Sequence, residues 1–187
     1  MKYCSECSAI VQLKIPEGDT FPRYICESCQ TIHYQNPKII TGCIATWQGK
    51  ILLCRRAIEP RYGLWTLPAG FMENNETAQQ GAARETMEEA QAKITDVKLF
   101  GVFNIPHISQ VYMMFSGEVK DGKSAPGQES IEVEWFEEAN IPWKELAFPV
   151  VQESLELHFL DKVRQRVTVH YGDIIRDLNN KVTVNRY

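Results

Sequence analysis

The sequence predicts an α/β sandwich with a mixed sheet, preceded by a small metal-binding element. Strand-like runs alternate unevenly with two stretches of helical periodicity. Two close pairs of cysteines stand near the N-terminus, and 44% of the 187 residues are hydrophobic, which is enough for one substantial domain with a buried core. We expect the metal-binding element at residues 1–35, the sandwich at 36–165 and a β-like C-terminal extension at 166–187.

The four N-terminal cysteines form two CxxC pairs, Cys4 with Cys7 and Cys26 with Cys29, separated by 18 residues. This spacing is typical of a zinc ribbon, in which four thiolates hold one tetrahedral Zn²⁺. About 30 residues are too few for a hydrophobic core, so we expect a structural zinc to supply the folding energy. A redox pair, or a site that has lost its metal, is the alternative. For nearby His33 we expect a structural or interface role, because four cysteines already complete the site.

Strand-like runs recur along the rest of the chain and also within the ribbon. They cover residues 11–15, 21–25, 39–47, 50–56, 97–105, 110–119, 130–136, 167–171 and 182–185. The pair Gln48-Gly49 indicates a hairpin, and we expect Cys43 and Cys54, on either side of it, to be small core residues. The last two runs, which residues 173–181 separate, could pair with each other, extend the main sheet, or exchange with a second subunit.

Two segments have helical periodicity. Thr77 and Gln80 have the pattern of a capping box, which predicts that the first helix begins at Ala78. Before it, Pro68 and Gly70 exclude a helix, and we expect a loop there that exposes backbone groups. The second helix is expected at residues 150–163, with an apolar stripe of Val151, Leu155 and Phe159 facing the core.

The first helix gathers carboxylates on one face. At about 100° per residue, Glu85, Glu88 and Glu89 fall within an arc of roughly 100°. The arc expected to face a core holds Ala82, Ala83, Thr86, Met87 and Ala90. The three like charges repel one another, and Arg84 alone compensates too little, so we expect Mg²⁺ or Mn²⁺ among these hard oxygen ligands. A solvated acidic face is the alternative. Gly81, on the acidic side, either leaves room for a phosphate or is a tolerated glycine.

Charge and hydropathy exclude other classes of protein. A formal net charge of −4 gives no basic excess for nonspecific binding to nucleic acid. There is no apolar run close to the ~20 residues that span a membrane, and no apolar h-region follows Met1. We therefore expect a cytoplasmic protein.

The helix and the residues before it resemble the signature of the Nudix family. Gly70, five residues, Glu76, seven residues and then Arg84-Glu85-Thr86-Met87-Glu88-Glu89 match the Nudix box. The resemblance implies a Nudix-type α/β/α sandwich that hydrolyses pyrophosphate bonds with Mg²⁺ or Mn²⁺. It implies that Glu85 and Glu89 are the principal metal ligands and that Glu88 is an additional ligand.

The same resemblance assigns roles to the residues around these ligands. The carbonyl group next to Gly70 can add a ligand, Arg84 orients a glutamate, and Glu76 supports either the ligands or the helix. The family's closing glycine is replaced by Gln91. Either Gln91 adopts the left-handed conformation, at a cost of about 1 kcal/mol, or the helix continues past it.

Residues outside the box complete the expected site. Some family members use a glutamate ahead of a later strand as a base or ligand, and Glu129 stands at such a place. Arg55 and Arg56 point to opposite faces of a strand, so one of them can contact the diphosphate. The candidate platforms for adenine are Phe71, Phe103 and Tyr112, for each of which a core position is the alternative.

The zinc ribbon narrows the range of possible substrates. A ribbon ahead of a Nudix domain resembles the NADH pyrophosphatase branch and the ADP-ribose and FAD pyrophosphatases. The sequence Ser-Gln-Pro-Trp-Pro-Phe-Pro of NADH pyrophosphatases is absent, and residues 24–42 resemble the ADP-ribose and FAD group. We therefore expect a small nucleotide substrate, ADP-ribose or FAD. The alternatives are NADH or another dinucleotide, capped RNA or damaged nucleoside triphosphates, and a zinc-ribbon binding or regulatory protein. Many relatives form dimers, so a homodimer is also an expectation.

Overall fold

The computed structural model describes residues 1–166 and 168–187. The chain divides into two compact units, Met1–Pro37 and Lys38–Tyr187. Within the described residues, the helices are all too short or too polar to cross a membrane.

The first unit is a small antiparallel sheet. Its strands are β1 (Val11–Lys14), β2 (Arg23–Cys26) and β3 (Ile32–His33), in the order β1-β2-β3. The hydrophobic cluster of this unit consists of Cys4, Val11 and Cys26, with Ala9 and Tyr24 packed against it. Two of the three cluster residues are cysteines, so this unit has almost no apolar core of its own.

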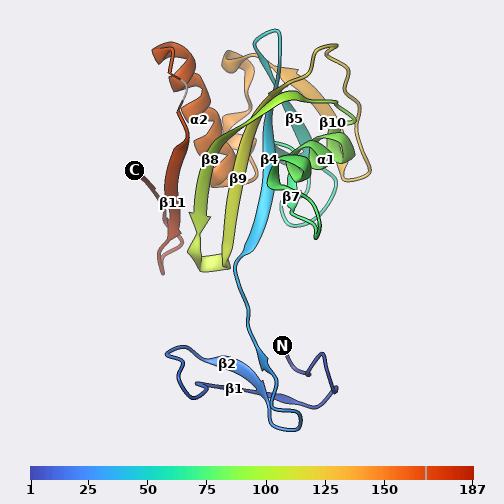
Figure 1. Ribbon diagram of the computed structural model, residues 1–187. Helices are drawn as coiled ribbons and strands as arrows, with labels where there is room; N and C mark the ends of the chain where they lie inside the picture. Colours follow the sequence, from blue (N-terminus) through green and yellow to red (C-terminus); the bar gives the residue numbers. More distant parts are fainter. Residues whose placement is uncertain (167) are drawn as a thin grey trace. The chain divides into compact units, whose positions relative to one another are not determined.

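The second unit is built on a mixed nine-stranded sheet (Figure 1). Its strands are β4 (Lys38–Trp47), β5 (Lys50–Arg56), β6 (Trp65–Thr66), β7 (Ala69–Phe71), β8 (Thr95–Ile105), β9 (Gln110–Glu118), β10 (Ser130–Phe136), β11 (His170–Arg176) and β12 (Val182–Arg186). The order is β10-β5-β4-β9-β8-β11-β12, with β6 paired to β5 and β7 paired to β4. The pairs β4–β9 and β8–β11 are parallel, and the other pairs are antiparallel.

Two α-helices cover the sheet, α1 (Ala78–Ala90) and α2 (Pro149–Arg164), and three short 3₁₀ turns complete the unit. These turns are η1 (Pro106–Ile108), η2 (Glu138–Asn140) and η3 (Trp143–Glu145). Alternate residues of the strands point to opposite faces, and they divide between two cores. In β5, Leu53 packs in the core that contains Leu155 of α2, while Leu52 packs in the core that contains Ala82 of α1. The predicted α/β/α sandwich is therefore confirmed.

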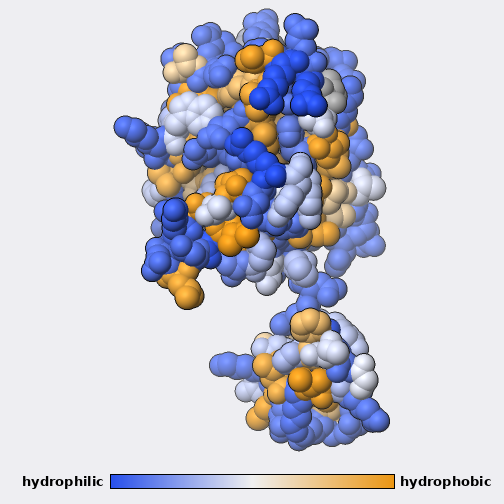
Figure 2. All heavy atoms as spheres, turned by 90° about the vertical axis from the view of Figure 1, so that its left-hand side faces the viewer, coloured by the Kyte–Doolittle hydropathy of each residue, from blue (hydrophilic) through white to orange (hydrophobic). Residues whose placement is uncertain are grey.

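Several local predictions agree with the structure. The capping box at Thr77 and Gln80 is present, and α1 begins at Ala78. Cys43 and Cys54 are buried core residues, and the stripe of α2 is buried throughout. Figure 2, which views the molecule from the side of β11 and α2, shows a largely hydrophilic surface with separate apolar patches.

Other local predictions were wrong. Residues 69–71 form strand β7 and not a loop, because Pro68 precedes the strand and its missing N–H interrupts no ladder hydrogen bond. Met87 is 43% exposed. The core face of α1 is limited to positions such as Thr86, and Met87 lies about 100° further around the helix.

The C-terminal residues extend the main sheet. β11 lies parallel to β8 and pairs with β12 in an antiparallel hairpin. The strand expected at residues 167–171 instead runs from His170 to Arg176, so it extends into the segment expected to separate the two runs. Val167, the first residue of the expected strand, lies outside the described residues.

Candidate functional site

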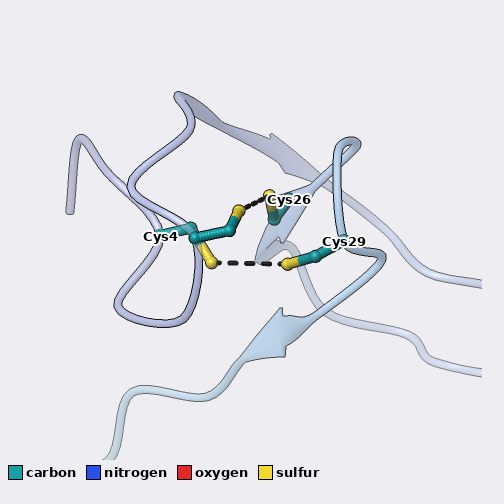
Figure 3. Close-up of side chains that lie close together, drawn as sticks. Cys4, Cys26 and Cys29 are labelled. Atoms are coloured by element: carbon teal, nitrogen blue, oxygen red, sulfur yellow. Dashed lines mark hydrogen bonds between the residues drawn. The ribbon is translucent and has the colours of Figure 1, made fainter.

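The four N-terminal cysteines converge on a common centre, and Figure 3 shows Cys4, Cys26 and Cys29 pointing toward it. The sulfur atoms of Cys4 and Cys29 lie 3.6 Å apart, those of Cys7 and Cys26 lie 3.4 Å apart, and all four lie within 4.8 Å of one another. Tetrahedral Zn–S bonds of ~2.3 Å separate the sulfur atoms by about 3.8 Å. The four thiols therefore fit one zinc ion.

His33 lies beside this centre without being needed as a ligand. Its Nε2 atom is 3.2 Å from the sulfur of Cys4, and His33 lies on β3, which pairs with β2. On the other side, the hydroxyl group of Thr31 lies 3.1 Å from the sulfur of Cys29 and lowers the pKa of that thiol to about 6. Hydrogen bonds of this kind stabilise thiolates, the form that binds zinc.

In the second unit, the side chain of Arg84 organises the acidic face of α1. It donates two hydrogen bonds to Glu76, from Nε at 3.0 Å and from Nη2 at 2.8 Å, and Nη2 also donates to the carbonyl of Phe71 at 3.1 Å. Its Nη1 atom donates to Glu85 at 2.6 Å and to Glu88 at 2.8 Å. One guanidinium thus ties the helix to β7 and holds three carboxylates.

The ion pair with Arg84 holds the pKa of Glu76 at about 2. The carboxylate of Glu76 also accepts a hydrogen bond from the backbone N–H of Glu73 at 2.7 Å, ahead of the helix. Glu76 does not line the cavity that Glu85, Glu88 and Glu89 share. Its contacts fix the segment that leads into α1, so its position suits the expected supporting role.

Glu85 and Glu89 are buried acids. They are 8% and 6% exposed. Burial raises the pKa of both groups, and for Glu89 burial together with the nearby charge of Glu85 raises the pKa to about 8. Removal from water disfavours the charged form of an acid unless a cation compensates. Two buried carboxylates that repel each other are a donor set suited to a divalent cation.

Gly70 leaves space for one of these carboxylates. A Cβ atom built on Gly70 would lie 2.4 Å from the carboxyl group of Glu85. The glycine therefore lets β7 approach α1 closely, and its backbone lies beside the carboxylate. This proximity is compatible with a carbonyl ligand from the segment Ala69–Gly70.

Glu129 reaches the same site because its loop is fixed to the end of α1. The N–H of Ala125 donates to the carbonyl of Ala90 at 2.8 Å, and the N–H of Gly127 donates to that of Glu89 at 2.9 Å. A Cβ atom on Gly127 would lie 1.7 Å from the carbonyl oxygen of Glu88, so this approach requires glycine. The loop satisfies carbonyl groups that the helix end leaves free.

Gln91 ends α1 in the left-handed conformation, with φ of 48°. This settles the two expectations for the residue that replaces the family's glycine, because the helix does not continue past it. The side-chain amide of Gln91 donates, through Nε2, to the carbonyl of Pro126 at 2.9 Å. That hydrogen bond offsets part of the backbone strain and holds the loop that carries Glu129.

A single cavity of about 1180 Å³ contains most of the expected site. The expected residues that line it are Gly70, Phe71, Arg84, Glu85, Glu88, Glu89, Glu129, Arg56 and Tyr112. Arg55 does not line the cavity: it donates to the carbonyl of Gly63 at 2.9 Å and pairs with Glu132 at 3.4 Å. Phe103 is 1% exposed within the core, so it offers no surface for stacking.

Gly81 does not provide room for a phosphate. A Cβ atom there would lie 2.6 Å from the hydroxyl oxygen of Thr41 and 2.8 Å from Glu76 Oε1. The glycine instead allows α1 to pack closely on β4, which rules out the first of the two alternatives, room for a phosphate.

Several residues of the cavity were not anticipated from the sequence. They include His107 and Ile108 of η1, Phe148 ahead of α2, and Ile174, Arg176 and Val182 of the C-terminal hairpin. The ring of Phe148 lies under Arg56, with the guanidinium carbon 5.1 Å from the ring centroid. The strand-like pattern was visible for the hairpin, but nothing local in the sequence indicates its pairing with β8.

The two candidate metal sites differ in how closely their ligand atoms are already arranged around one point. Among the residues that the structure describes, the four cysteines form the one group whose ligand atoms all lie within 4.8 Å of one another. The carboxylates share a cavity, but Arg84 holds Glu85 and Glu88 in ion pairs. The chemistry of the acidic set fits Mg²⁺ or Mn²⁺, which accept oxygen ligands and retain water.

Comparisons with known proteins agree with this architecture. The family model of the NUDIX domain matches residues 37–157, and the zinc-ribbon model described as Nudix N-terminal matches residues 2–35. A crystal structure of a NUDIX hydrolase from Nitrosomonas europaea is 54% identical, with a TM-score of 0.90, over 94% of this chain and 100% of that one.

Two curated relatives are more distant. The NAD-capped RNA hydrolase NudC of Vibrio vulnificus is 30% identical over 145 residues, which are 76% of this chain and 53% of the relative. The ADP-ribose pyrophosphatase of Methanocaldococcus jannaschii is 34% identical over 122 residues, 62% of this chain and 69% of the relative. The chain spans about half the length of the NudC relatives that it matches. The domain match, the ribbon match and the carboxylate-lined cavity lead to one conclusion: this chain belongs to the Nudix hydrolase family.

Proposed function

We propose that this protein hydrolyses the pyrophosphate bond of a nucleoside diphosphate linked to another moiety, with ADP-ribose or FAD as substrate. The cavity carries this proposal, because it joins a buried acidic cluster to a wall of apolar side chains. A divalent metal held by the carboxylates would attract the anionic diphosphate, and apolar walls suit the nucleoside attached to it. The name of the M. jannaschii relative supports the same substrate.

The proposed chemistry assigns one task to each group. When bound to Glu85, Glu88 and Glu89, Mg²⁺ or Mn²⁺ supplies charge neutralisation of the diphosphate and acidifies a water molecule for attack on phosphorus. Arg84 orients Glu85 and Glu88 through its ion pairs. Glu129 acts as a base that accepts the proton of the attacking water, or as a further ligand.

Arg56 is the candidate for direct contact with the diphosphate. It lines the cavity, its charge acts on Glu89, and it has no carboxylate within 4.0 Å among the described residues. Its Nε donates to the carbonyl of Pro60 at 2.9 Å, which fixes the guanidinium next to Phe148. Phe71, 49% exposed in the same cavity, is available to stack on a ring of the substrate.

A second candidate is hydrolysis of NADH or another NAD-containing dinucleotide. Several NudC relatives, named as NAD-capped RNA hydrolases, favour it. The absence of the Ser-Gln-Pro-Trp-Pro-Phe-Pro sequence favours ADP-ribose or FAD instead. Both candidates share the bond that is cut, so only the substrate distinguishes them.

A substrate panel tests the proposal. Purified protein is incubated with ADP-ribose, FAD, NADH, diadenosine polyphosphates or nucleoside triphosphates, with Mg²⁺ or Mn²⁺, and the products are separated by chromatography. We expect AMP from ADP-ribose or FAD at the highest kcat/KM. Preference for NADH would select the second candidate, and no metal-dependent hydrolysis of any compound would refute both. Light scattering on the same sample tests the expected homodimer.

A further inference from the structure

The C-terminal hairpin forms part of the cavity, although it lies beyond residues 37–157 that match the NUDIX domain. Ile174 and Arg176 of β11 and Val182 of β12 line this cavity. In the register of the hairpin, Arg176 is directly opposite Val182. Ile174 is two residues from Arg176, so its side chain lies on the same face. One face of the hairpin therefore directs Val182 and the guanidinium of Arg176 toward the cavity, while Ile174, 2% exposed, packs in the core beside them.

This face lies far from the carboxylates. Glu85 contacts Gly70 of β7, and β4, β9 and β8 lie between β7 and β11. Four strand spacings amount to about 19 Å. The floor between the two ends includes a row of paired residues, Phe71, Ile40 and Tyr112, on β7, β4 and β9. A substrate whose diphosphate lies at the acidic end would extend along this floor toward the hairpin.

Specific contacts fix the hairpin in place. Arg186 of β12 pairs with the buried Glu153 of α2 through two hydrogen bonds, at 2.6 and 2.9 Å. At the start of β11, His170 Nε2 lies 2.7 Å from Asp161 of α2. Asn104 of β8 donates to Asp173 at 2.8 Å. These contacts attach the hairpin to α2 and β8 and so fix where it presents its side chains.

Arg176, like Arg56 at the acidic end of the cavity, differs from the ion-paired arginines of the cavity and the hairpin. Arg84 and Arg186 are each paired with carboxylates, whereas Arg176 has no carboxylate within 4.0 Å among the described residues. Its donors remain available beside apolar groups. A nucleobase has flat apolar faces and ring nitrogen acceptors at its edge, and arginine recognises purine acceptors through its planar set of donors.

We propose that the β11–β12 hairpin binds the purine base of the substrate, with Val182 against the ring, Ile174 packed beneath Val182 and Arg176, and Arg176 donating to the ring nitrogens. This inference rests on the proposed function, because it takes the acidic end as the place of the diphosphate. It makes Arg176 a specificity-determining residue supplied by the C-terminal extension and not by the Nudix box.

Arg176→Ala and Arg176→Lys test the assignment, with Arg164→Ala as the matched control because Arg164 is exposed and does not line the cavity. We expect KM for ADP-ribose to rise about tenfold in Arg176→Ala, the loss of one hydrogen bond from a charged donor, with kcat nearly unchanged. Lysine should restore little of the lost affinity for ADP-ribose, since its ammonium group lacks the planar arrangement of donors of a guanidinium. KM for UDP-glucose, which has no purine, should change less than twofold.

Two outcomes overturn the proposal: an unchanged KM for ADP-ribose, or an equal rise for ADP-ribose and UDP-glucose, which would indicate contact with phosphate. Calorimetric titration of ADP-ribose without metal separates the inference from the proposed function. If the wild type binds ADP-ribose without hydrolysing it and Arg176→Ala weakens binding, the proposed function fails and the base site stands. If hydrolysis is normal and Arg176→Ala binds as the wild type does, the base site fails alone.

Discussion

The two candidate metal-binding regions of this chain offer opposite ligand chemistry and would depend on a metal for different reasons. The ribbon offers four thiols whose sulfur atoms already surround one point, and its cluster of buried residues is little more than Cys4, Val11 and Cys26. The Nudix unit has two extensive cores and places its carboxylates at the rim of a cavity, where Arg84 holds two of them. In the first region the metal replaces a core, and in the second a core supports a site for a metal.

This difference predicts which region fails when its metal is lost. The ribbon should unfold, because zinc contributes about 10–16 kcal/mol to such elements, whereas the Nudix unit has its own core and should stay folded. Hydrogen exchange after removal of zinc by a chelator should show loss of protection within Met1–Pro37 alone. Cys26→Ser should have the same effect, and Ser28→Ala, between the two ligands of the second CxxC pair, should have none.

Cysteine reactivity provides an internal control for that experiment. Burial raises the pKa of Cys43 to about 12 and also raises that of Cys54, so both thiols should resist alkylation in the folded Nudix unit. Chelation should make only the four ribbon cysteines reactive toward the alkylating reagent. Labelling of Cys43 or Cys54 on chelation would mean that the two units do not fold independently.

A smaller effect is expected from the ion pair that attaches the C-terminal hairpin. Arg186→Ala leaves the buried carboxylate of Glu153 without its partner, and loss of such a partner costs about 3 kcal/mol, the low end of the range because Arg186 is half exposed. Chemical denaturation should report this loss in the Nudix unit. Arg164→Ala, at the end of α2, which also carries Glu153, should change the free energy of unfolding little. An equal effect of the two variants would mean that the ion pair between Arg186 and Glu153 does not stabilise the hairpin.

The smallest effect concerns the loop that carries Glu129. Gly127→Ala introduces a methyl group where the carbonyl of Glu88 lies, and the loop must move. We expect a loss of about 1–3 kcal/mol in stability and a fall in kcat, because Glu129 would leave its place. Lys123→Ala, in an exposed part of the same connection, is the control. Normal kcat in Gly127→Ala would indicate that Glu129 has no part in the chemistry.

Local patterns predicted the parts of the fold that local interactions determine. The capping box of Thr77 and Gln80 satisfies backbone groups within four residues, so it was readable in the sequence. The CxxC spacing predicted the convergence of the cysteines for the same reason. The alternation of Arg55 and Arg56 predicted that they separate, but only the pairing of β5 with β10 and β6 determines which of them faces the cavity.

Long-range pairing was not predictable from these patterns. β11 lies parallel to β8, about 70 residues earlier in the chain, and no turn signal connects the two. The contribution of Ile174 and Arg176 to the cavity follows from that pairing. Likewise, the close packing of Gly81 on Thr41 depends on how near α1 approaches β4, which periodicity does not reveal.

In the proposed function, the carboxylates of α1 hold the catalytic metal while the cysteines hold a separate structural zinc. Glu89→Gln tests it, with Glu134→Gln, an exposed residue of β10, as the control. Zinc content and metal-dependent hydrolysis of ADP-ribose are measured on the same preparations. We predict that Glu89→Gln keeps its zinc and loses more than about 100-fold in kcat, because outer-shell changes alone cost 10–100-fold. Hydrolysis at the wild-type rate, or loss of zinc together with activity, would show that Glu89 does not hold a separate catalytic metal.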